Sequence, residues 1–380
     1  MKFKKVFPAF IGVGSVWLAT AFGPGFSSGT LLNAFFTKHG FFGIFTPFLS
    51  MLILGLAIYF AIEFSRIYKV RNFRDYADNL YSPWQKILGA LIDFCFLYTI
   101  VAVLGACLAA GGEILERFWS IPYWWGIAGL IIIGGIFCIF GAELVRRASS
   151  YIMISAIIII LTSIIMVIIV GNPDLEGAIV NNAVHATNPS LLAAIWSAIL
   201  FAAHQSCAIP NIVSVTEVLK SKNDSKKAAL FGSFGNILLM VPMIFIMFSF
   251  TNKMPIIDDA LPLYSVLQTL NIPWLTTIYV LIVLMAIISS IFAFIYAGIA
   301  RYEKYVKISN EKIRAGTIAA FILIVCVFIA SFGFLAIVSV GFIIMAYISL
   351  PLILLPALFV ARHKISKKYQ NKHKKPIPIE

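Results

Sequence analysis

The stretch ATAFGPGFSSG, residues 19–29, interrupts an apolar run that extends over 8–36. Pro24 has no amide hydrogen to donate, and Gly23 and Gly25 on either side of it release the backbone from helical geometry. A continuous α-helix through this stretch is therefore excluded. Because the run is otherwise long and apolar enough to cross a bilayer, we expect the helix to unwind at mid-membrane.

A second interruption lies about half a chain further on, in the sequence AAHQSCAIPN at residues 202–211. Polar side chains and Pro210 again stand inside an apolar run. Gly23 and His204 are 181 residues apart, and five apolar runs follow the start of each half. Since five is odd, the second half enters the membrane inverted relative to the first, as in one class of secondary transporter. The sequence therefore predicts a 5+5 inverted repeat with helices 1 and 6 broken.

The composition indicates a membrane protein. Of the 380 residues, 61% are hydrophobic and 12% are charged, and the mean hydropathy is +0.96, whereas soluble domains are about half apolar and about a quarter charged. Because one spanning helix uses about 20 residues, the chain suffices for about ten spans, which excludes a sizeable soluble domain. We expect an all-α polytopic protein with spans near 8–36, 41–67, 84–116, 122–142, 148–170, 189–218, 227–251, 273–300, 313–331 and 333–360.

The positive charges are distributed unequally between the two sides of the expected membrane. The formal net charge is +13. With the N-terminus in the cytoplasm, only Lys38, Arg117 and Lys253 lie outside, as the positive-inside rule requires. The excess of positive charge therefore reflects membrane topology and not a nucleic-acid-binding face. Both termini are expected in the cytoplasm, where the basic tail is solvated or rests on anionic headgroups. A cleaved signal peptide is rejected, because no small-residue cleavage box precedes Gly23.

The sequence carries no motif for enzymatic chemistry. It contains no catalytic triad, paired-carboxylate geometry, P-loop or dinucleotide-binding glycine motif. The cysteines are odd in number, lie in apolar runs and show no CxxC or Cys/His pairing. We therefore expect neither disulfides nor a zinc site, no cofactor, and no metal beyond a coupling ion, and we interpret the thiols as small buried hydrophobes: Cys95, Cys107, Cys138, Cys207 and Cys326.

The two breaks and the five-plus-five order resemble the amino acid–polyamine–organocation (APC) superfamily, whose members have the LeuT fold. The segments Phe10–Gly14 and Gly23–Phe26 are similar to its glycine-rich first helix. Within that group, the length, the basic tail and the AFGPGFSSG segment look most like YkvI-type bacterial membrane proteins. The resemblance implies a bacterial cytoplasmic membrane protein with a first repeat at 1–170, a second at 189–361 and a cytoplasmic tail at 362–380.

The first break predicts part of a substrate site. Unwound backbone in hydrocarbon needs a cavity, an ion or a ligand to satisfy its polar groups. We expect a half-helix to begin near Ser27, with its N-terminus presenting amides to a carboxylate from Gly23, Gly25, Ser27 and Ser28. The alternative is a plain Gly-Pro kink between packed helices. Phe22, Phe26 and Phe201 flank the breaks and either close over a ligand or only pack.

Further candidate substrate contacts lie in spans 6 and 3. His204 stands at bilayer depth in the second break beside Gln205, where an ionisable group is costly and functional by default. We expect it to bind substrate or to carry a coupled proton. The structural alternative is a neutral imidazole that caps unpaired backbone groups at the break. Tyr98 reaches mid-membrane in span 3 and resembles the family tyrosine that touches the substrate.

Span 8 contains a candidate ion site. Ala286, Ser289 and Ser290 share one helix face, and the resemblance implies a Na⁺ site formed by them with the carbonyls of Ala19 and Phe22. The alternative is that the serines satisfy carbonyls of their own helix. The sequence leaves Na⁺ and H⁺ coupling open. Glu63, Asp93 and Glu113 lie within spans and are candidates for proton coupling, for gating or for pairing with nearby Lys and Arg.

Together these features predict a secondary active transporter that works by alternating access and moves a small polar solute, most simply an amino acid or related zwitterion, with Na⁺ or H⁺. The alternative is a membrane receptor subunit with the same fold that senses an amino acid, as in spore germinant receptors. A passive channel is disfavoured because no selectivity-filter ring is present. The small-molecule substrate and the bilayer are the expected partners, and the sequence leaves the oligomeric state open.

Overall fold

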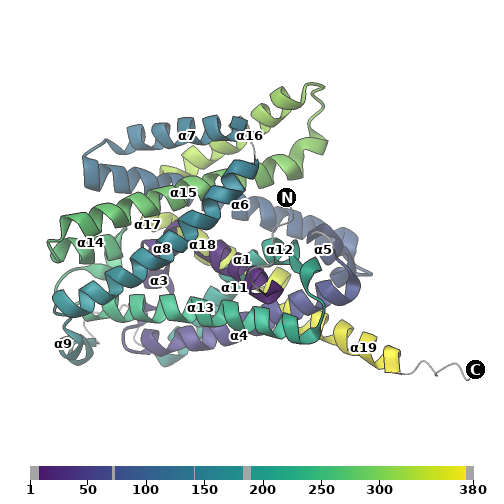
Figure 1. The fold of residues 1–380 in the computed structure, drawn as a ribbon, viewed down its shortest axis with the longest axis horizontal. Coiled ribbons are helices and arrows are strands. Elements are labelled where there is room, and N and C mark those ends of the chain that lie inside the picture. Colours follow the sequence, from purple (N-terminus) through teal and green to yellow (C-terminus); the bar gives the residue numbers. More distant parts are fainter. Residues whose placement is uncertain (1–7, 71–72, 141, 183–189, 374–380) are drawn as a thin grey trace, which may run out of the picture.

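The computed structural model describes residues 8–70, 73–140, 142–182 and 190–373, except for the side chains of 134–153, Ala300, Lys304 and 371–373. Throughout these ranges every regular element is a helix (Figure 1). The expected all-α architecture is therefore confirmed.

The first half of the chain contains the helices of spans 1 to 5. Its elements are α1 (Ala9–Ala21), α2 (Pro24–Ser27), α3 (Thr30–Phe35), η1 (Thr37–His39), α4 (Phe42–Tyr68), α5 (Phe73–Tyr81), α6 (Gln85–Trp119), α7 (Tyr123–Phe140), α8 (Ala142–Val170) and α9 (Leu175–Val180). Span 1 is divided among α1, α2 and α3, and the fifth span begins earlier than expected, at Ala142.

The second half contains spans 6 to 10. Its elements are α11 (Leu191–Gln205), η2 (Ser206–Ala208), α12 (Ile209–Val213), η3 (Thr216–Val218), α13 (Lys222–Ser249), η4 (Ile256–Asp258), α14 (Pro262–Thr269), α15 (Pro273–Tyr302), η5 (Glu303–Tyr305), α16 (Glu311–Ala330), α17 (Phe334–Ala336), η6 (Ile337–Gly341), α18 (Phe342–Ser349), η7 (Leu350–Leu354), η8 (Pro356–Ala361) and α19 (Arg362–His373). The turn between spans 9 and 10 contains Gly333 at φ +82°, a conformation that suits glycine.

The apolar helices agree with the spans expected from the sequence. In the part of the chain that the structure describes, seven helices are long and apolar enough to cross a membrane. Three shorter apolar helices lie at Ala9–Ala21, Tyr123–Ile133 and Ile154–Val170, within the expected spans 1, 4 and 5. The polytopic membrane fold is therefore confirmed.

Helix contacts repeat with an offset of five spans. α1 packs on α13 while its counterpart α11 packs on α4, and α8 contacts α13 while its counterpart η8 contacts α4. Similarly, α7 contacts α15 while α16 contacts α6. In Figure 1, α1 and α11 lie at the centre, with α4 and α13 on one side and α6 and α15 on the other. This is the pairing that two related five-helix units produce, whereas the boundaries given for the repeats stay predictions.

The molecule has two ends along the direction of its spans. One end carries α5 and α19, at the right of Figure 1, and the other carries α9 and α14, at the left. We call the first the N-side, because α1 begins there, and the second the far side. Spans 1, 3 and 8 run between these ends, so the breaks in spans 1 and 6 lie between the two sides.

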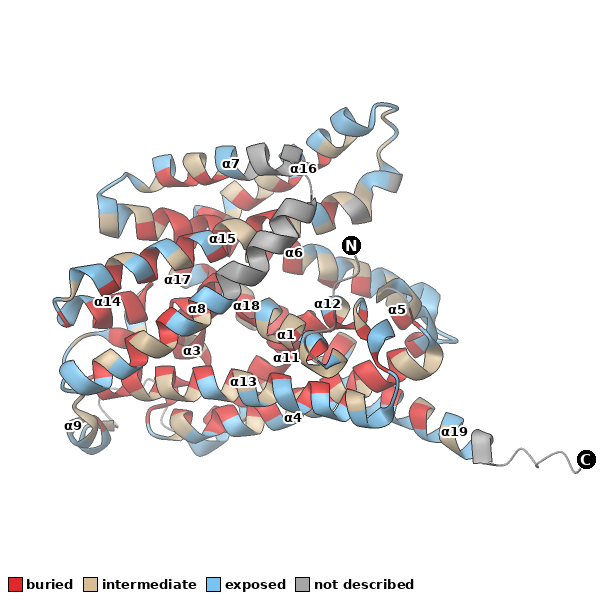
Figure 2. Ribbon diagram, in the orientation of Figure 1, coloured by how far each residue is buried: buried red, intermediate tan, exposed pale blue. Residues whose placement is uncertain are grey.

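The outer faces of the helices are apolar, as contact with lipid requires. One face of α8 carries four isoleucines at helical spacing that are each more than half exposed: Ile154, Ile158, Ile165 and Ile169. Figure 2 shows exposed residues on the outward faces of such helices and buried residues toward the interior. This inside-out pattern indicates that hydrocarbon, not water, covers the outer faces of these spans.

Small residues allow α1 and α13 to approach closely. A Cβ on Gly232 of α13 would lie 2.2 Å from Cε3 of Trp17, and one on Gly14 would lie 2.9 Å from the carbonyl oxygen of Ala228. Close backbone approach of this kind is what small residues provide between membrane helices. It fixes α1, and therefore the break at its end, against span 7.

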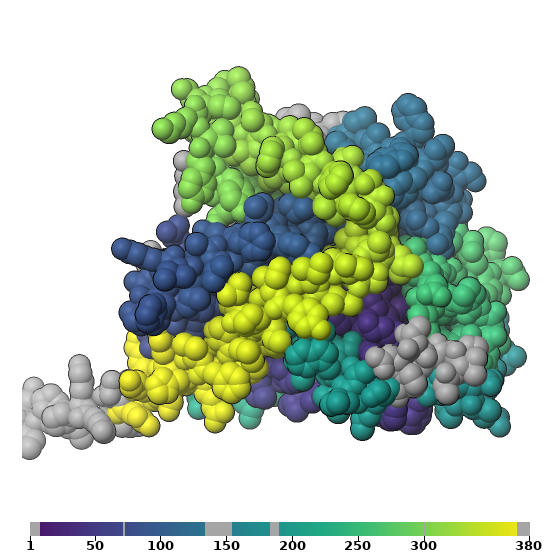
Figure 3. Space-filling view, turned by 180° about the vertical axis from the view of Figure 1, so that it is seen from behind, coloured from purple at the N-terminus to yellow at the C-terminus, as the bar shows by residue number. Residues whose placement is uncertain are grey.

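The last span continues without interruption into α19. Figure 3 shows residues from about 335 onward (yellow) as one diagonal band that passes beside the blue α5–α6 region, and η8 contacts both α5 and α4. Tyr369 of α19 donates a hydrogen bond to Glu63 of α4 at 2.5 Å. The start of the basic tail is thus docked on span 2 at the N-side.

Candidate functional site

Span 1 is interrupted between Ala21 and Pro24. Phe22 has φ −84° and ψ 63°, and Gly23 is extended with φ −89° and ψ −180°. α2 begins directly at Pro24, whose missing amide hydrogen is tolerated at a first helical position. The unwound centre predicted from the glycines and proline is present. The expected start of the half-helix near Ser27 is wrong, because Gly23 already serves as its N-cap.

The interruption leaves backbone groups without partners. The amides that would usually donate to the Ala19 and Phe22 carbonyls are those of Gly23 and Phe26, and they donate instead to the carbonyls of Ala21 and Gly23. Among the described residues, no hydrogen-bond donor reaches the carbonyl oxygens of Ala19 or Phe22, and no acceptor reaches the amide of Gly25. Unpaired polar backbone at this depth requires a ligand, an ion or water.

The interruption of span 6 has a different form. α11 gives way to the three-ten turn Ser206–Ala208, and α12 resumes at Ile209. Ser206 and Ala208 keep right-handed helical angles. This break therefore changes the hydrogen-bond pattern from α-helical to three-ten without unwinding the chain. The residues before Pro210 can therefore remain bonded, whereas those around Gly23 cannot.

His204 lies at this second break in an aromatic sandwich. Its ring stacks on Phe342 with centroids 4.8 Å apart and on Phe35 with centroids 5.9 Å apart. The side chain is 6% exposed, and Nδ1 has no hydrogen-bond partner in the described structure. His204 and Gln205 both line the central cavity, so one face of span 6 offers polar atoms to whatever fills it.

A cavity of about 840 Å³ joins the two breaks. Its walls come from spans 1, 3, 6, 8 and 10, and it continues toward the N-side, where Phe73 of α5 and Val215 line it. Residues on its wall are exposed, including Gly12, Ala19, Asn211, Ser214 and Ala293. The cavity is therefore open to the N-side.

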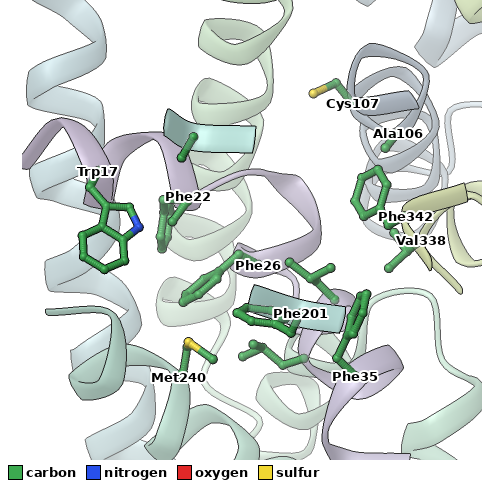
Figure 4. Close-up of a cluster of buried hydrophobic side chains, with 14 of the residues drawn as sticks. Trp17, Phe22, Phe26, Phe35, Ala106, Cys107, Phe201, Met240, Val338 and Phe342 are labelled. Carbon is green, nitrogen blue, oxygen red and sulfur yellow. The ribbon is translucent and has the colours of Figure 1, made fainter. Parts of the chain in front are cut away.

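Aromatic side chains close the inner end of the cavity. Phe22 and Phe26 line it and have ring centroids 5.6 Å apart. Behind them Phe35 and Phe201 meet edge to face at 5.5 Å; Figure 4 shows Phe26, Phe201 and Phe35 near one another in this cluster. Phe201 is fully buried and does not line the cavity, so its position is that of a packing residue.

The far side is closed by the segment around α14. Leu263 donates its amide to the carbonyl of Ser28 at 3.0 Å, and the Thr30 hydroxyl donates to the carbonyl of Ala260 at 2.5 Å. Tyr279 donates to the carbonyl of Ser27 at 2.9 Å. Gly29 is required here, because its φ is +85° and a Cβ would lie 2.7 Å from Sδ of Met247. These contacts seal α2 and α3 under α14.

Several predicted substrate residues lie away from the cavity. Ser27 and Ser28 are buried and direct their hydroxyls to the carbonyl of Pro24 at 3.3 Å and 2.7 Å, while their own carbonyls bind span 8 and α14. The Tyr98 hydroxyl donates to the carbonyl of Gly341 at 3.0 Å. Their roles as substrate contacts stay predictions, whereas Phe22, Gly23, Gly25, Phe26, His204 and Gln205 do line the cavity.

The candidate ion residues are brought to the same cavity. Ala19, Phe22, Ser289 and Ser290 all line it, which places spans 1 and 8 across from each other. Ala286 does not line it, and its carbonyl accepts the Ser290 hydroxyl at 2.9 Å. This is the intrahelical bond of the alternative interpretation, and an ion would have to replace it. The Na⁺ site therefore stays a prediction.

The three carboxylates within spans are each paired with an arginine. Glu63 is fully buried and receives Arg66 at 2.6 Å, and Asp93 pairs with Arg301 of α15. Glu113 and Asp259 both contact Arg117, at 2.7 Å each. None of the three lines the central cavity, so their geometry is that of structural or gating pairs.

Sequence reasoning missed several polar residues of the wall. Cys95 and Thr99 of α6, Cys207 of η2, and Asn211 and Ser214 beyond it all line the cavity. Cys95 and Cys207 were expected only to fill space. Cys107 and Cys326 are fully buried as expected, while the side chain of Cys138 lies outside the described residues. The four-residue spacing of Cys95 and Thr99 marks a common helix face, but only its neighbours reveal that the face lines a cavity.

No protein-family model and no curated protein sequence matches the chain. Solved structures do match its fold. A manganese transporter of Eremococcus coleocola aligns with TM-score 0.61 and 13% identity, over 97% of this chain and 88% of that one. A Na⁺-coupled sialic acid symporter in a substrate-bound outward-open state aligns with TM-score 0.61 and 15% identity, over 93% and 79%. MhsT in complex with L-phenylalanine aligns with TM-score 0.55 and 14% identity, over 95% and 98%.

These structures define the class of fold. They share the LeuT architecture, and they cover nearly the whole described chain, so the chain has the LeuT fold that the two breaks predicted. The two proteins that align with TM-score 0.61 are named as a transporter and a symporter. At 13–15% identity the likeness extends to architecture alone.

Proposed function

We propose that this protein is a secondary active transporter that moves a small zwitterionic solute, such as an amino acid, by alternating access coupled to a cation. The observation that carries the proposal is one cavity at the unwound centre of span 1. That cavity is open to the N-side and sealed on the far side by α14. A site that faces one side while a packed layer closes the other is half of an alternating-access cycle.

The chemistry of the cavity supports a zwitterion. Its described lining includes no Asp, Glu, Lys or Arg, so a ligand with net charge would be poorly compensated. Within the described ranges the Gly25 amide at the start of α2 has no acceptor and suits a carboxylate, and the Ala19 and Phe22 carbonyls have no donor and suit a cationic group or ion. A volume of about 840 Å³ holds such a solute with accompanying water.

For the coupling ion we propose Na⁺ held by the carbonyls of Ala19, Phe22 and Ala286 and the hydroxyls of Ser289 and Ser290. Hard cations prefer oxygen ligands, and the sialic acid symporter with the same fold is named as Na⁺-coupled. The alternative is proton coupling through His204, whose Nδ1 lacks a partner in the described chain. Na⁺ coupling predicts that substrate affinity changes with NaCl concentration, whereas proton coupling predicts that it changes with pH.

We further propose that the protein is a YkvI-type member of the APC superfamily and lies in a bacterial cytoplasmic membrane, with the N-side in the cytoplasm. The N-side carries the basic residues of α19 and of the loop between spans 8 and 9, as the positive-inside rule favours. The structure then corresponds to an inward-open state.

Concentrative uptake in proteoliposomes tests this function. Candidate amino acids are first screened by thermal shift of the purified protein, with Na⁺ and pH varied. A stabilising solute should then accumulate inside liposomes above its outside concentration under an imposed Na⁺ or proton gradient, and accumulation should collapse with an ionophore. A solute that binds but never accumulates under either gradient would contradict transport and favour the receptor alternative.

A further inference from the structure

Two thiols from different spans meet at the wall of the central cavity. Cys95 lies on α6 and Cys207 on the three-ten turn of span 6, and both line the cavity. The hydroxyl oxygen of Ser349 lies 3.7 Å from the Cys95 sulfur and 3.1 Å from the Cys207 sulfur. The two sulfur atoms are therefore no farther apart than these distances together, about 6.8 Å.

The surroundings hold both side chains in place. The Thr99 hydroxyl donates to the Cys95 carbonyl at 2.9 Å and lies 3.6 Å from the Cys207 sulfur. Cys95 is 1% exposed, whereas Cys207 is partly exposed. Spans 3, 6 and 10 thus contribute one group each to a cluster of two sulfurs and a hydroxyl that can be reached through the cavity.

We propose that Cys95 and Cys207 form a dithiol site that binds a thiophilic d¹⁰ metal ion such as Cd²⁺ from the N-side. Thiolate ligands select soft ions. Metal–sulfur bonds of the length seen with zinc, about 2.3 Å, join sulfurs up to about 4.6 Å apart. Two thiols that share the Ser349 hydroxyl can bind one ion when side-chain rotation brings their sulfurs to that separation. Each thiol loses its proton to solvent as a metal–sulfur bond forms, so one divalent ion releases two protons.

The charge balance favours a divalent metal ion at the two thiols. A divalent ion with two thiolates is neutral, which suits a wall whose described residues include no charged side chain. In the described chain no group of three or more His, Cys, Asp or Glu side chains could hold a metal. Beside the two sulfurs the site has the hydroxyls of Thr99 and Ser349, and the described cavity lining includes no carboxylate, so it should discriminate against Mn²⁺ and Mg²⁺.

Binding at this site would hinder transport. The ion would tie span 3 to the break of span 6 and, through the Ser349 hydroxyl, to span 10. These elements must move relative to one another if the cavity is to open on the far side. Thiophilic metals should therefore inhibit the transporter by holding it open to the N-side.

The test is Cd²⁺ binding to the purified full-length protein, followed by calorimetry and by the ultraviolet absorbance of cadmium–thiolate bonds. We expect one Cd²⁺ per protein with thiolate absorbance and no comparable binding of Mn²⁺. Cys95→Ser and Cys207→Ser should each weaken binding by at least about 100-fold, the upper end of the loss caused by removing an outer-shell partner. Cys107→Ser, on the same helix as Cys95, and Cys326→Ser are matched controls that should bind as the wild type does.

The result is separate from the transport proposal, because binding is measured without a substrate. Thermal melting and gel filtration of each variant show whether it is folded, and the milder Ser349→Ala variant reports on the site without removing a thiol. Absence of stoichiometric Cd²⁺ binding by the wild type would overturn the proposal. Unchanged binding in folded Cys95→Ser or Cys207→Ser protein would overturn it equally.

Discussion

The guanidinium of Arg117 lies 2.7 Å from the carboxylate of Asp259, and this contact joins span 3 to the segment that precedes α14. Arg117 also holds Glu113 of its own helix at 2.7 Å and accepts the Tyr264 hydroxyl on its carbonyl at 3.4 Å. The pair therefore fastens the layer that closes the cavity on the far side.

Arg117→Gln should loosen this closure. Because Arg117 is one-third exposed and Asp259 less so, the pair is worth on the order of 1 kcal/mol, about a fivefold change in the ratio of closed to open far side. Hydrogen exchange of the amides in α14 measures it. Arg74→Gln, which breaks the exposed pair with Asp78 on α5, is the control, and equal exchange in both variants would contradict a gating role.

Gly23 and Gly25 should respond differently to a leucine. A Cβ on Gly23 meets nothing within 4 Å, and its extended φ suits any residue, so Gly23→Leu should fold normally and obstruct the cavity. A Cβ on Gly25 would lie 3.2 Å from the Leu31 Cβ and 3.5 Å from the Phe342 ring, so Gly25→Leu should also lower the melting temperature. Substrate titration and thermal melting separate the two effects. Normal substrate affinity in Gly23→Leu would remove this cavity as the binding site.

Gly232→Ala should destabilise the protein, because the added methyl group overlaps the Trp17 ring. Overpacking of this kind costs about 1–3 kcal/mol. Gly89→Ala is a matched control in the interior of α6, where a Cβ meets nothing within 4 Å and alanine should be neutral or stabilising by up to about 1 kcal/mol. Thermal unfolding in one detergent compares them. Equal melting temperatures would show that α1 and α13 are not packed as described.

Substitution of Ser289 and Ser290 tests which ion is coupled to the substrate. With Na⁺ at Ala19, Phe22 and span 8, wild-type substrate affinity should be higher in NaCl than in KCl at equal ionic strength, since ion and substrate affinities are reciprocally coupled. The Ser289→Ala/Ser290→Ala double variant should lose that difference. Ser339→Ala, which removes a hydroxyl that donates to the Leu335 carbonyl at 2.7 Å, should keep it. Equal wild-type substrate affinity in both salts, with affinity rising as pH falls, would contradict the Na⁺ site and indicate proton coupling through His204.

The fold could be predicted from the sequence because span lengths, helix breakers and charges are local features. The turn at Gly333 appears between spans 9 and 10, where the expected span boundaries place it. Which way a side chain faces depends on how each helix is rotated by its neighbours. Ser27 and Ser28 adjoin the break, yet their hydroxyls donate to the Pro24 carbonyl, and their carbonyls accept hydrogen bonds from α15 and α14.

The candidate site was predictable only where the backbone determines it. The glycines and Pro24 require the interruption whatever surrounds them, so Phe22, Gly23 and Gly25 were found. The thiols of Cys95 and Cys207 meet through the packing of three spans distant in sequence, and no spacing rule reveals that. The form of the second break also escaped prediction, because Ser206 and Ala208 can continue a helix as a three-ten turn.

The central claim is that one cavity is reached alternately from the two sides, and two-sided labelling of Ala19→Cys tests it most directly. In a background with the native cysteines replaced by serine, a membrane-impermeant maleimide is applied to oriented vesicles from either face. Ala19 is exposed on the cavity wall, so the account predicts fast labelling from the N-side. It also predicts slower but measurable labelling from the far side, which Arg117→Gln should accelerate. Labelling from the N-side alone, in Na⁺ and K⁺ buffers and with Arg117→Gln as well, would contradict alternating access.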